Sequence, residues 1–374
     1  MTPPPPPAPP PPPPPPPPRH PASPQLPLPL AAAPTDVPSA DLRTHADGVP
    51  QRPGYVDPWF ELPRLDLPIV LEPSGLDLRS LIELPEGSAL TLAELQTDES
   101  HGRPRLVAAR YGQTGGQIFY PASTIKWITA AIAVEWMQRH GLNPETVIQV
   151  GDDRPATLRE LILASLVMSD NDAFNALQEA VGFAHTHAVL RSWGVVDGLI
   201  RRHFTRPHWN HSRPVTLHPP GGPSRTLAAR PAVDLPLSRD PRPAPLGNPE
   251  ANAFTTDDLV RVAAATLTGP TRDCPSFPLL TAGLAWTNQN YLRRGLTRLT
   301  AQHADRPAFV TLQKPGWWPP DGANSELAYI YDVRRRRHCF LAVYIQGGID
   351  QAEAAMGQVA HDLFGALHDG SAML

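Results

Sequence analysis

Lysine is almost absent from this chain of 374 residues: all but two of its 32 basic residues are arginine, and the exceptions are Lys126 and Lys314. Cysteine is equally scarce, with only Cys274 and Cys339. Two cysteines exclude a disulfide-rich scaffold, and their spacing matches no zinc-binding motif. One disulfide and two free thiols are both compatible with the sequence.

The chain also lacks a surplus of positive charge and any long apolar run. A net charge of −4 argues against the broad basic surface that nucleic-acid binding requires, and the run Arg334–Arg337 is too short to reverse this. No stretch approaches the ~18 consecutive apolar residues of a membrane-spanning helix. The first residues show neither the charged start nor the apolar core of a secretory signal. We therefore expect no nucleic-acid partner and no membrane span.

Proline, in contrast, is abundant, and its 50 residues are concentrated in two segments. Residues 1–58 begin with an almost unbroken proline tract and cannot bury enough apolar surface to offset the entropy of ordering. We expect a polyproline-II spacer that merges into disorder, a passive tether rather than a ligand for proline-recognising modules. Residues 206–250 form a second proline-rich insert, whose prolines predict an absence of regular structure. With this insert, residues 59–374 are expected to form one domain.

Apolar patterning in the folded part begins with strands and then changes to a helical period. Residues 82–95 and 104–111 have the pattern of two strands of a meander, joined by a polar turn. From Ser123 onward, apolar residues surround almost the whole helical circumference, which is typical of a helix in the centre of a large domain. This helix is expected to end near Gly141, a plausible C-cap.

Later segments continue with helices and end with strands. Thr157 and Glu160 have the spacing of a capping box, in which each side chain satisfies an unpaired backbone N–H at the start of a helix. Further helices are expected over 172–181, 257–267 and 353–367, and further strands over 309–313, 326–333 and 338–346. This order predicts an α/β (α+β) fold: an antiparallel sheet whose first and last strands adjoin, with helices on both faces and a helical subdomain.

Ser123 and Lys126 carry the strongest chemical signal. Residues three apart at the start of a helix project from one face, so the lysine amine can reach the serine hydroxyl. If burial or a second cation lowers the pKa of the amine, it can take the hydroxyl proton and activate the serine as a nucleophile. The helix N-terminus favours an oxyanion formed beside it. Alone, the Ser-x-x-Lys pattern is a weak signal, because it more often marks an ordinary helix start.

Two other motifs have matching chemistry. Ser-Asp-Asn at 169–171 lies in a polar break between two expected helices, where Ser169 can relay a proton and Asn171 can bind a substrate amide. Lys-Pro-Gly at 314–316 follows the strand expected over 309–313 and places a cation and a close backbone approach at a sheet edge. Taken separately, the first motif is compatible with a loop that carries an N-cap, and the second with a simple turn.

In this order, the three motifs resemble the serine β-lactamase and penicillin-binding protein superfamily, whose signatures are Ser-x-x-Lys, Ser-Asp-Asn and Lys-Thr-Gly. Class A β-lactamases are the most similar members, and the likeness extends over most of residues 80–370. The resemblance makes Ser123 the acylated nucleophile, Lys126 its base and Ser169 the proton shuttle. The blocks that carry it are FYPASTIKW, TLRELILASLVMSDNDAFNAL, NAFTTDDLVRVAAATL and QKPGWWPPDGANSELAYIYD.

The same resemblance implies a set of substrate-binding groups. Asn171 is expected to contact the substrate amide, and Lys314 the substrate carboxylate. Gly316 lets the backbone approach closely. The backbone N–H groups of Ser123 and Trp317 are expected to form the oxyanion hole.

Two departures from the family pattern affect the expected reaction. Pro315 replaces the usual Thr or Ser and removes a hydroxyl that would help to hold a carboxylate. Class A enzymes have a Glu-x-x-Leu-Asn motif whose glutamate activates the deacylating water, and this chain has Arg206 where that glutamate is expected. The sequence therefore predicts acylation at Ser123 followed by slow deacylation.

The resulting prediction is a serine hydrolase that forms a covalent acyl-enzyme with a β-lactam or a related amide or ester. A peptidoglycan DD-peptidase or an esterase is the alternative, and a substrate-binding protein with a decayed site is a second one. No cofactor or metal is expected, because His203, His208 and His211 have no fixed helical context and no acidic neighbour. A small molecule or a cell-wall peptide is the expected partner of a monomeric chain, and the resemblance implies a periplasmic or secreted location.

Overall fold

The computed structural model describes residues 57–97, 103–112, 117–204, 211–231, 251–287, 290–302, 308–318 and 322–374. These ranges cover most of the domain expected over 59–374. The proline-rich leader expected over 1–58 lies outside the described residues, except for its last two positions.

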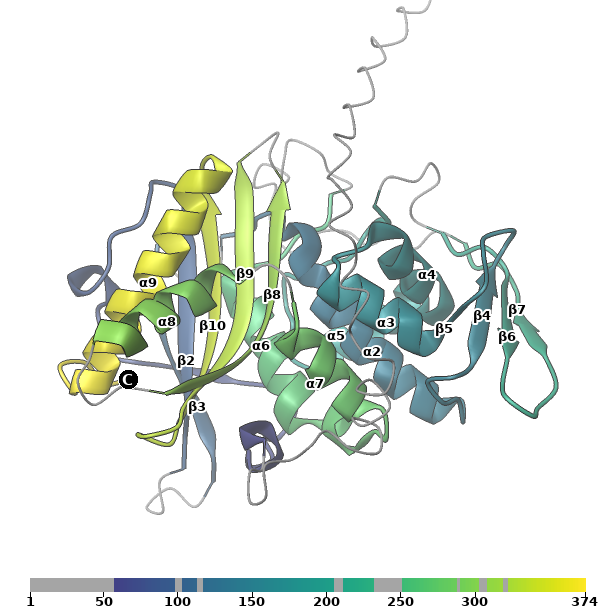
Figure 1. The fold of residues 1–374 in the computed structure, drawn as a ribbon, viewed down its shortest axis with the longest axis horizontal. Helices are drawn as coiled ribbons and strands as arrows, with labels where there is room; N and C mark the ends of the chain where they lie inside the picture. The colour runs from purple at the N-terminus through teal and green to yellow at the C-terminus, as the bar shows by residue number, and fades with distance from the viewer. Residues whose placement is uncertain are drawn as a thin grey trace, which may run out of the picture. The chain divides into compact units, whose positions relative to one another are not determined.

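A six-stranded sheet forms one half of the domain (Figure 1). Its strands, in spatial order, are β1 (Leu71–Pro73), β3 (Arg105–Tyr111), β2 (Ala89–Gln96), β10 (Arg337–Gln346), β9 (Ala323–Asp332) and β8 (Phe309–Trp318). The first long strand pairs with the last, with Leu90 opposite Val343, so the predicted adjacency of first and last strands is confirmed. All pairs are antiparallel except β1 with β3, which run parallel.

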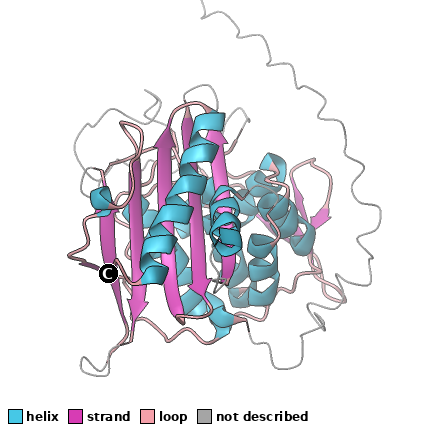
Figure 2. Ribbon diagram, turned by 60° about the vertical axis from the view of Figure 1, so that its left-hand side comes forward, coloured by secondary structure: helices cyan, strands magenta, loops and turns pink. Residues whose placement is uncertain are grey.

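Helices cover both faces of this sheet, as predicted. They are α8 (Tyr291–Gln302) and α9 (Ile349–Asp369) on one face and α6 (Thr256–Thr268) on the other. Figure 2 shows α9 crossing the strands of the first face. Successive side chains of a strand point to opposite faces, so Leu90 and Leu92 pack with α8 and α9 while Ala93 and Leu95 join the second core. Packing on both sides explains why β2 is buried almost throughout.

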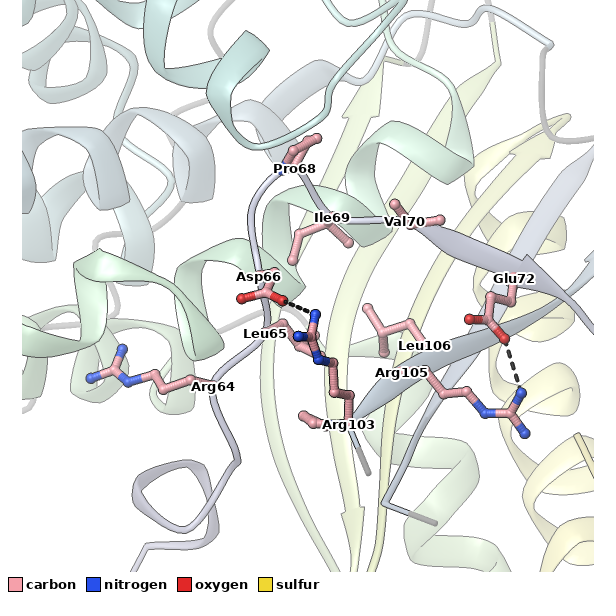
Figure 3. Close-up of a pocket in the computed structure, with 11 residues that line it drawn as sticks. Arg64, Leu65, Asp66, Pro68, Ile69, Val70, Glu72, Arg103, Arg105 and Leu106 are labelled. Atoms are coloured by element: carbon pink, nitrogen blue, oxygen red, sulfur yellow. Dashed lines mark hydrogen bonds and ion pairs between the residues drawn. The ribbon is translucent and has the colours of Figure 1, made fainter. Parts of the chain in front are cut away.

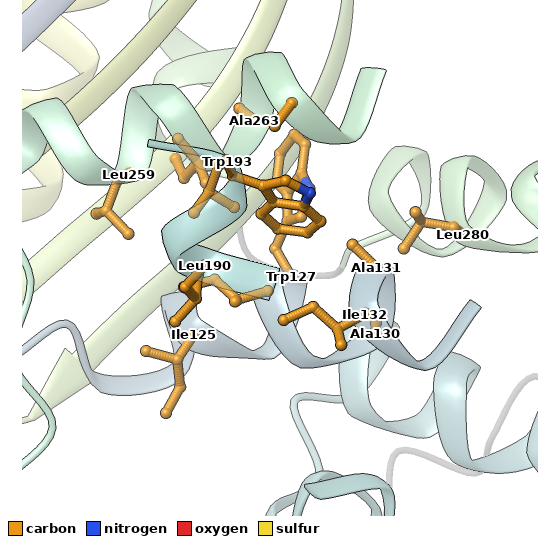
Figure 4. Close-up of a cluster of buried hydrophobic side chains, with 14 of the residues drawn as sticks. Ile125, Trp127, Ala130, Ala131, Ile132, Leu190, Trp193, Leu259, Ala263 and Leu280 are labelled. Atoms are coloured by element: carbon orange, nitrogen blue, oxygen red, sulfur yellow. The ribbon is translucent and has the colours of Figure 1, made fainter. Parts of the chain in front are cut away.

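The other half of the domain is helical and is organised around α2 (Ile125–Arg139). Every residue of α2 from Ile125 to Met137 is buried, which confirms the predicted central helix. Figure 4 shows Trp127 and Ile132 of α2 among side chains from neighbouring helices, including Trp193 and Leu280. The surrounding helices are α3 (Leu158–Val167), α4 (Asn171–Val181), α5 (Phe183–Ser192) and α7 (Phe277–Ala285).

Local sequence signals account for several helix boundaries. Thr157 and Glu160 form the predicted capping box at the start of α3. Asp170 caps α4 by accepting a hydrogen bond from the backbone N–H of Ala173 at 2.8 Å. The described ranges also contain short 3-10 turns, among them η1 (Pro58–Phe60), η2 (Leu78–Ser80) and η5 (Pro270–Asp273).

The prediction that the insert over 206–250 has no regular structure is wrong for the part that is described. Two short strands in this insert, β6 (Val215–His218) and β7 (Arg225–Leu227), extend a four-stranded sheet that also contains β4 (Val147–Val150) and β5 (Ala156–Thr157). Pro214 and Pro219 lie immediately outside β6, where they remove no hydrogen bond from the ladder. Arg213 ties the insert to α4 through an ion pair with Glu179 at 2.9 Å.

Other differences concern strand lengths and the cysteines. The strand expected over 82–95 begins only at Ala89, and the strand expected over 309–313 continues to Trp318 at the sheet edge. Cys274 and Cys339 are both buried and free, so the structure favours two thiols over one disulfide. None of the helices in the described ranges is long and apolar enough to cross a membrane.

Candidate active site

Ser123 and Lys126 lie at the entrance to the central helix. Ser123 belongs to a 3-10 turn, η3 (Ala122–Thr124), that leads directly into α2. Nζ of Lys126 donates a hydrogen bond to Oγ of Ser123 at 3.1 Å. The turn is strained, because Ala122 has a φ of +46°, a conformation that costs roughly 1–3 kcal/mol and is found preferentially at functional sites. The serine is partly exposed and the lysine fully buried, so a substrate can reach the hydroxyl while the amine stays dry.

The loop between α3 and α4 brings Ser169 and Asn171 to the same amine. Nζ of Lys126 donates to Oγ of Ser169 at 3.2 Å and to Oδ1 of Asn171 at 2.7 Å, and also to the backbone carbonyl of Ser169. Ser169 has a φ of +57°, so this residue too is held in a left-handed conformation that a non-glycine residue rarely adopts. The predicted polar break between two helices therefore contacts the Ser-x-x-Lys pair.

Lys314 contacts Ser169 from the sheet, whereas Lys126 contacts it from the central helix. It lies on β8, the edge strand that faces the helical half of the domain (Figure 1). Its Nζ donates to Oγ of Ser169 and to the carbonyl of Pro315, both at 3.0 Å. One hydroxyl thus lies between two lysine amines, and all the residues predicted to be catalytic, together with Asn171 and Lys314, converge on one site.

Burial changes the protonation of both lysines. It lowers the pKa of Lys126 to about 7, with Asp170 opposing the shift. It also lowers the pKa of Lys314 well below its usual value, and the neighbouring Lys126 adds to this effect while Glu326 opposes it. Desolvation disfavours the charged form of an amine, and a second cation disfavours it further. A substantial fraction of Lys126 is therefore neutral near pH 7 and able to accept a proton.

Gly316 lets β8 pack directly against η3. A Cβ atom at this position would lie 2.5 Å from the carbonyl oxygen of Pro121 and 2.7 Å from the backbone N of Ser123. Ser325 on β9 reinforces the contact, because its Oγ donates to the same Pro121 carbonyl at 2.8 Å and lies 2.7 Å from Oγ1 of Thr124. The glycine is required here by close approach, since any side chain would separate the two elements.

On the reactivity that the resemblance implies for Ser123, replacing Gly316 with alanine is expected to slow adduct formation with a fluorescent penicillin by about 10²-fold, because a shift of about 1 Å in positioning can cost that much. The rate is measured by gel fluorescence. Gly75→Ala is the matched control, since no heavy atom lies within 4 Å of its added Cβ. A Gly316→Ala protein that reacts at the rate of the Gly75→Ala control contradicts the assigned contact.

The two tryptophans that follow Gly316 have different environments. Trp318 is partly buried and makes an edge-to-face contact with Tyr120, with ring centroids 5.9 Å apart. Trp317 is 38% exposed. Trp318 therefore packs against the segment that leads to the nucleophile, whereas Trp317 presents an aromatic surface at the end of β8.

Phe204 is a neighbour of Lys126 that sequence reasoning missed. Its ring centroid lies 5.1 Å from Nζ of Lys126. Arg206, which stands where the catalytic glutamate of class A enzymes is expected, lies outside the described residues. The sequence offers only a partial signal for this contact: Asn175 lies one helical turn beyond Asn171, on the same face of α4. In the structure, the side chain of Asn175 binds the backbone of Phe204.

The histidines considered for a metal site and the surface pocket remain to be placed. His208 lies outside the described residues, and the described part of the chain contains no group of three His, Cys, Asp or Glu side chains that could hold a metal. Figure 3 shows a surface pocket lined by Arg103 and Arg105. It lies beside β1 and β3, at the sheet edge opposite β8, and its arginines are paired with Asp66 at 3.6 Å and Glu72 at 3.0 Å.

Comparison with known proteins supports the same class. A model of the beta-lactamase enzyme family matches residues 108–367. Among solved structures, a class A β-lactamase of the last common ancestor of Gram-negative bacteria is 23% identical, with a TM-score of 0.52 over 75% of this chain and 94% of that one. A β-lactamase from Burkholderia vietnamiensis is 16% identical, with a TM-score of 0.52 over 76% and 92%. PBP-A, solved as an acyl-enzyme complex of a mutant with penicillin G, is 14% identical, with a TM-score of 0.50 over 75% and 90%.

No curated protein matches the sequence. The fold is that of the class A β-lactamases, and the fold and the family match together define the chain as a β-lactamase-like hydrolase. Because the family model covers most of its length, the chain belongs to the beta-lactamase enzyme family.

Proposed function

We propose that this protein forms a covalent acyl-enzyme at Ser123 with a β-lactam or a related amide or ester. The observation that carries the proposal is the buried amine of Lys126, which lies within hydrogen-bond distance of both Ser123 Oγ and Ser169 Oγ. An amine with a pKa of about 7 matches the working range of a general base at neutral pH. The other two groups are the nucleophile and the proton carrier that such a base requires.

In the proposed acylation, the neutral amine of Lys126 takes the proton of Ser123 as Oγ bonds to the substrate carbonyl carbon. The tetrahedral intermediate then collapses, and the bond between the carbonyl carbon and the leaving nitrogen breaks. Ser169 gives its hydroxyl proton to that nitrogen and regains one from the ammonium of Lys126, 3.2 Å away. The products are an ester at Ser123 and a neutral amine, and both catalytic groups return to their starting states.

The negative charge that develops on the substrate carbonyl oxygen must be stabilised by hydrogen-bond donors. We assign this role to the backbone N–H groups of Ser123 and Trp317, because Gly316 brings β8 within van der Waals contact of η3. Backbone donors fixed in this way need no reorganisation during the reaction. We assign Asn171 to the substrate amide and Lys314 to a substrate carboxylate bound beside Ser169, whose Oγ lies 3.0 Å from Nζ of Lys314. A carboxylate at that position would raise the lowered pKa of Lys314 and favour its charged form.

A peptidoglycan DD-peptidase or an esterase remains the alternative activity. Pro315 offers no hydroxyl beside Lys314, so a carboxylate is held with one group fewer than in the Lys-Thr-Gly pattern. Turnover of acyl-D-Ala-D-Ala peptides or simple esters without hydrolysis of a β-lactam would favour this alternative. If the protein is instead a binding protein with a decayed site, its ligand binding should not depend on Ser123.

Consistent with the family, we place the protein outside the cytoplasm, with a small molecule or cell-wall peptide as its substrate.

The experiment that tests the proposal is incubation of the full chain with a fluorescent penicillin, followed by intact-protein mass spectrometry. We expect a mass increase of one penicillin per chain and localisation of the label to the peptide that contains Ser123. A protein that shows no mass increase after prolonged incubation contradicts the proposal.

The rate of adduct formation is expected to depend on pH through Lys126. Below pH 7 the amine is mostly protonated and cannot accept the hydroxyl proton. As the pH is raised toward 7, the rate of adduct formation is therefore expected to increase about tenfold per pH unit, and above pH ~7 it levels off. An ordinary lysine, with a pKa near 10.5, would instead give a rate that increases throughout the range from pH 5 to 9. The two cases are distinguished by quenching the reaction at set times over that pH range and measuring the labelled protein by gel fluorescence. A tenfold increase in rate between pH 8 and pH 9 contradicts the assignment of Lys126 as the base.

A further inference from the structure

Phe204 places a large apolar surface beside the catalytic amine. The distance of 5.1 Å from its ring centroid to Nζ of Lys126 is within the range of a cation–π contact. The side chain is only 5% exposed, and its ring packs against Phe174 with centroids 4.9 Å apart. This side of the amine is therefore bounded by the ring of Phe204, which is backed by a second aromatic ring and offers water no conventional hydrogen-bond partner.

Buried hydrogen bonds hold Phe204 in this position. Nδ2 of Asn175 donates to the carbonyl of Phe204, and the backbone N of Phe204 donates to Oδ1 of Asn175, both at 2.8 Å. Three and two residues earlier, the backbone N–H groups of Arg201 and Arg202 donate to Oδ1 of Asn252 at 2.8 and 3.0 Å. Side-chain amides from α4 and from the segment before α6 thus fix the backbone of Phe204 and of the residues that lead to it.

Hydrolysis of an ester at Ser123 requires a water and a base beside it. The water oxygen must bond to the ester carbonyl carbon while one of its protons passes to a base, and the bond from that carbon to Oγ must break as Oγ regains a proton. The amine of Lys126 already donates to Ser123, Ser169 and Asn171, and Phe204 lies against it. The segment 198–233, which contains Phe204, has no Asp or Glu that could serve as the base.

We propose that Phe204 is a positioning residue that sets the lifetime of the acyl-enzyme, by keeping a hydrolytic water away from the ester and from the amine of Lys126. This inference rests on the proposed function and extends it. The protein then accumulates as a covalent adduct and captures β-lactams stoichiometrically, with turnover limited by the ring. Acylation is unaffected by this barrier, because it needs no water.

The test measures adduct formation and adduct loss separately. The full-length protein is labelled with benzylpenicillin, free ligand is removed, and the labelled fraction is followed by intact mass. We expect the wild-type adduct to persist for hours. Phe204→Glu is expected to shorten the half-life of the adduct at least tenfold, because the carboxylate can take a proton from water at the place now occupied by the ring.

Three further variants separate this role from packing. Phe204→Gln admits water but adds no base; it is expected to shorten the half-life less than Phe204→Glu does and to shift the acid limb of acylation to higher pH, because the amine of Lys126 becomes better hydrated. Phe204→Leu remains apolar, and its adduct should stay long-lived. Phe174→Leu loosens the packing behind the ring without placing a polar group beside Lys126, and its adduct should also stay long-lived.

Failure of the inference and failure of the proposed function give different results. If the wild-type protein forms no adduct, the proposed function fails and the inference fails with it. If the adduct forms but its half-life is the same in the Leu, Gln and Glu variants at position 204, only the inference is overturned. Should Phe204→Glu fail to fold, the comparison of Phe204→Gln with Phe204→Leu decides in the same way, through both the half-life and the pH profile.

Discussion

Replacing Ser123 with alanine is expected to abolish the covalent adduct with penicillin, lowering the rate of its formation by at least about 10⁴-fold. The substitution removes the only atom of the proposed site that bonds to the substrate carbonyl carbon. The fold should be little affected, because Ser123 is partly exposed and Lys126 retains its hydrogen bonds to Ser169 and Asn171. Intact mass after incubation with a fluorescent penicillin measures the loss.

Ser165→Ala is the matched control for this prediction. Ser165 lies on α3, is fully buried, and its Oγ has no hydrogen-bond partner within the described structure. The same chemical change there should leave the rate of adduct formation as it is in the wild-type protein. An adduct of unchanged mass and rate on Ser123→Ala contradicts the assignment of the nucleophile, whatever the control shows.

Replacing Lys126 with arginine is expected to slow adduct formation by at least about 10³-fold. A guanidinium remains protonated at every accessible pH, so the variant keeps a cation but loses the base. The size of the effect lies in the range of about 10²–10⁴-fold that a general base contributes. A pKa of about 7 leaves about half of the lysine neutral at pH 7 and available to take the proton of Ser123. The rate is measured at pH 7 and pH 9 by gel fluorescence.

The Lys126→Met variant distinguishes between two roles of Lys126: a base that accepts the serine proton, and a positive charge that stabilises the site. If Lys126 acts as a base, the Arg and Met variants should be slow to a similar degree, and raising the pH should not restore the rate of either. If Lys126→Arg reacts within about tenfold of the wild-type rate while Lys126→Met does not, the lysine acts as a cation and the proposed mechanism of acylation is wrong.

Several elements of the fold were predictable because their determinants are local. The helix that begins beyond Ser123 is apolar around its circumference, and this pattern specifies burial on all sides whatever packs against it. The capping box of Thr157 and Glu160 is satisfied within four residues. The apolar strands at the two ends of the domain indicated that β2 and β10 adjoin, since neither could be buried by local neighbours alone.

Other elements could not be predicted, because distant segments decide them. The parallel pairing of β1 with β3 places Leu71 opposite Leu106, and no local pattern links these two segments. The strands β6 and β7 lie in a proline-rich segment and are stabilised by β4 and by the ion pair of Arg213 with Glu179. The extension of the strand at 309–313 to Trp318 is possible because β8 is an edge strand, where Pro315 is tolerated.

The candidate site divides in the same way. The sequence by itself determined the reactive groups, because a serine three residues before a lysine at a helix start, a Ser-Asp-Asn break and a Lys-Pro-Gly strand end are local patterns of chemistry. A chain that uses arginine for almost every cation has lysine at the two positions that now lie on either side of Ser169. An amine can lose its proton at neutral pH, and a guanidinium cannot.

Only the tertiary structure decided how those groups behave. Burial between the sheet and the helices lowers the pKa of both lysines, and desolvation is a property of the packed domain that no motif encodes. The contact of Phe204 with Lys126 likewise depends on Asn175, which binds a segment 29 residues away. The sequence thus specified which atoms can react, and the packing of distant segments specified their protonation and their access to water.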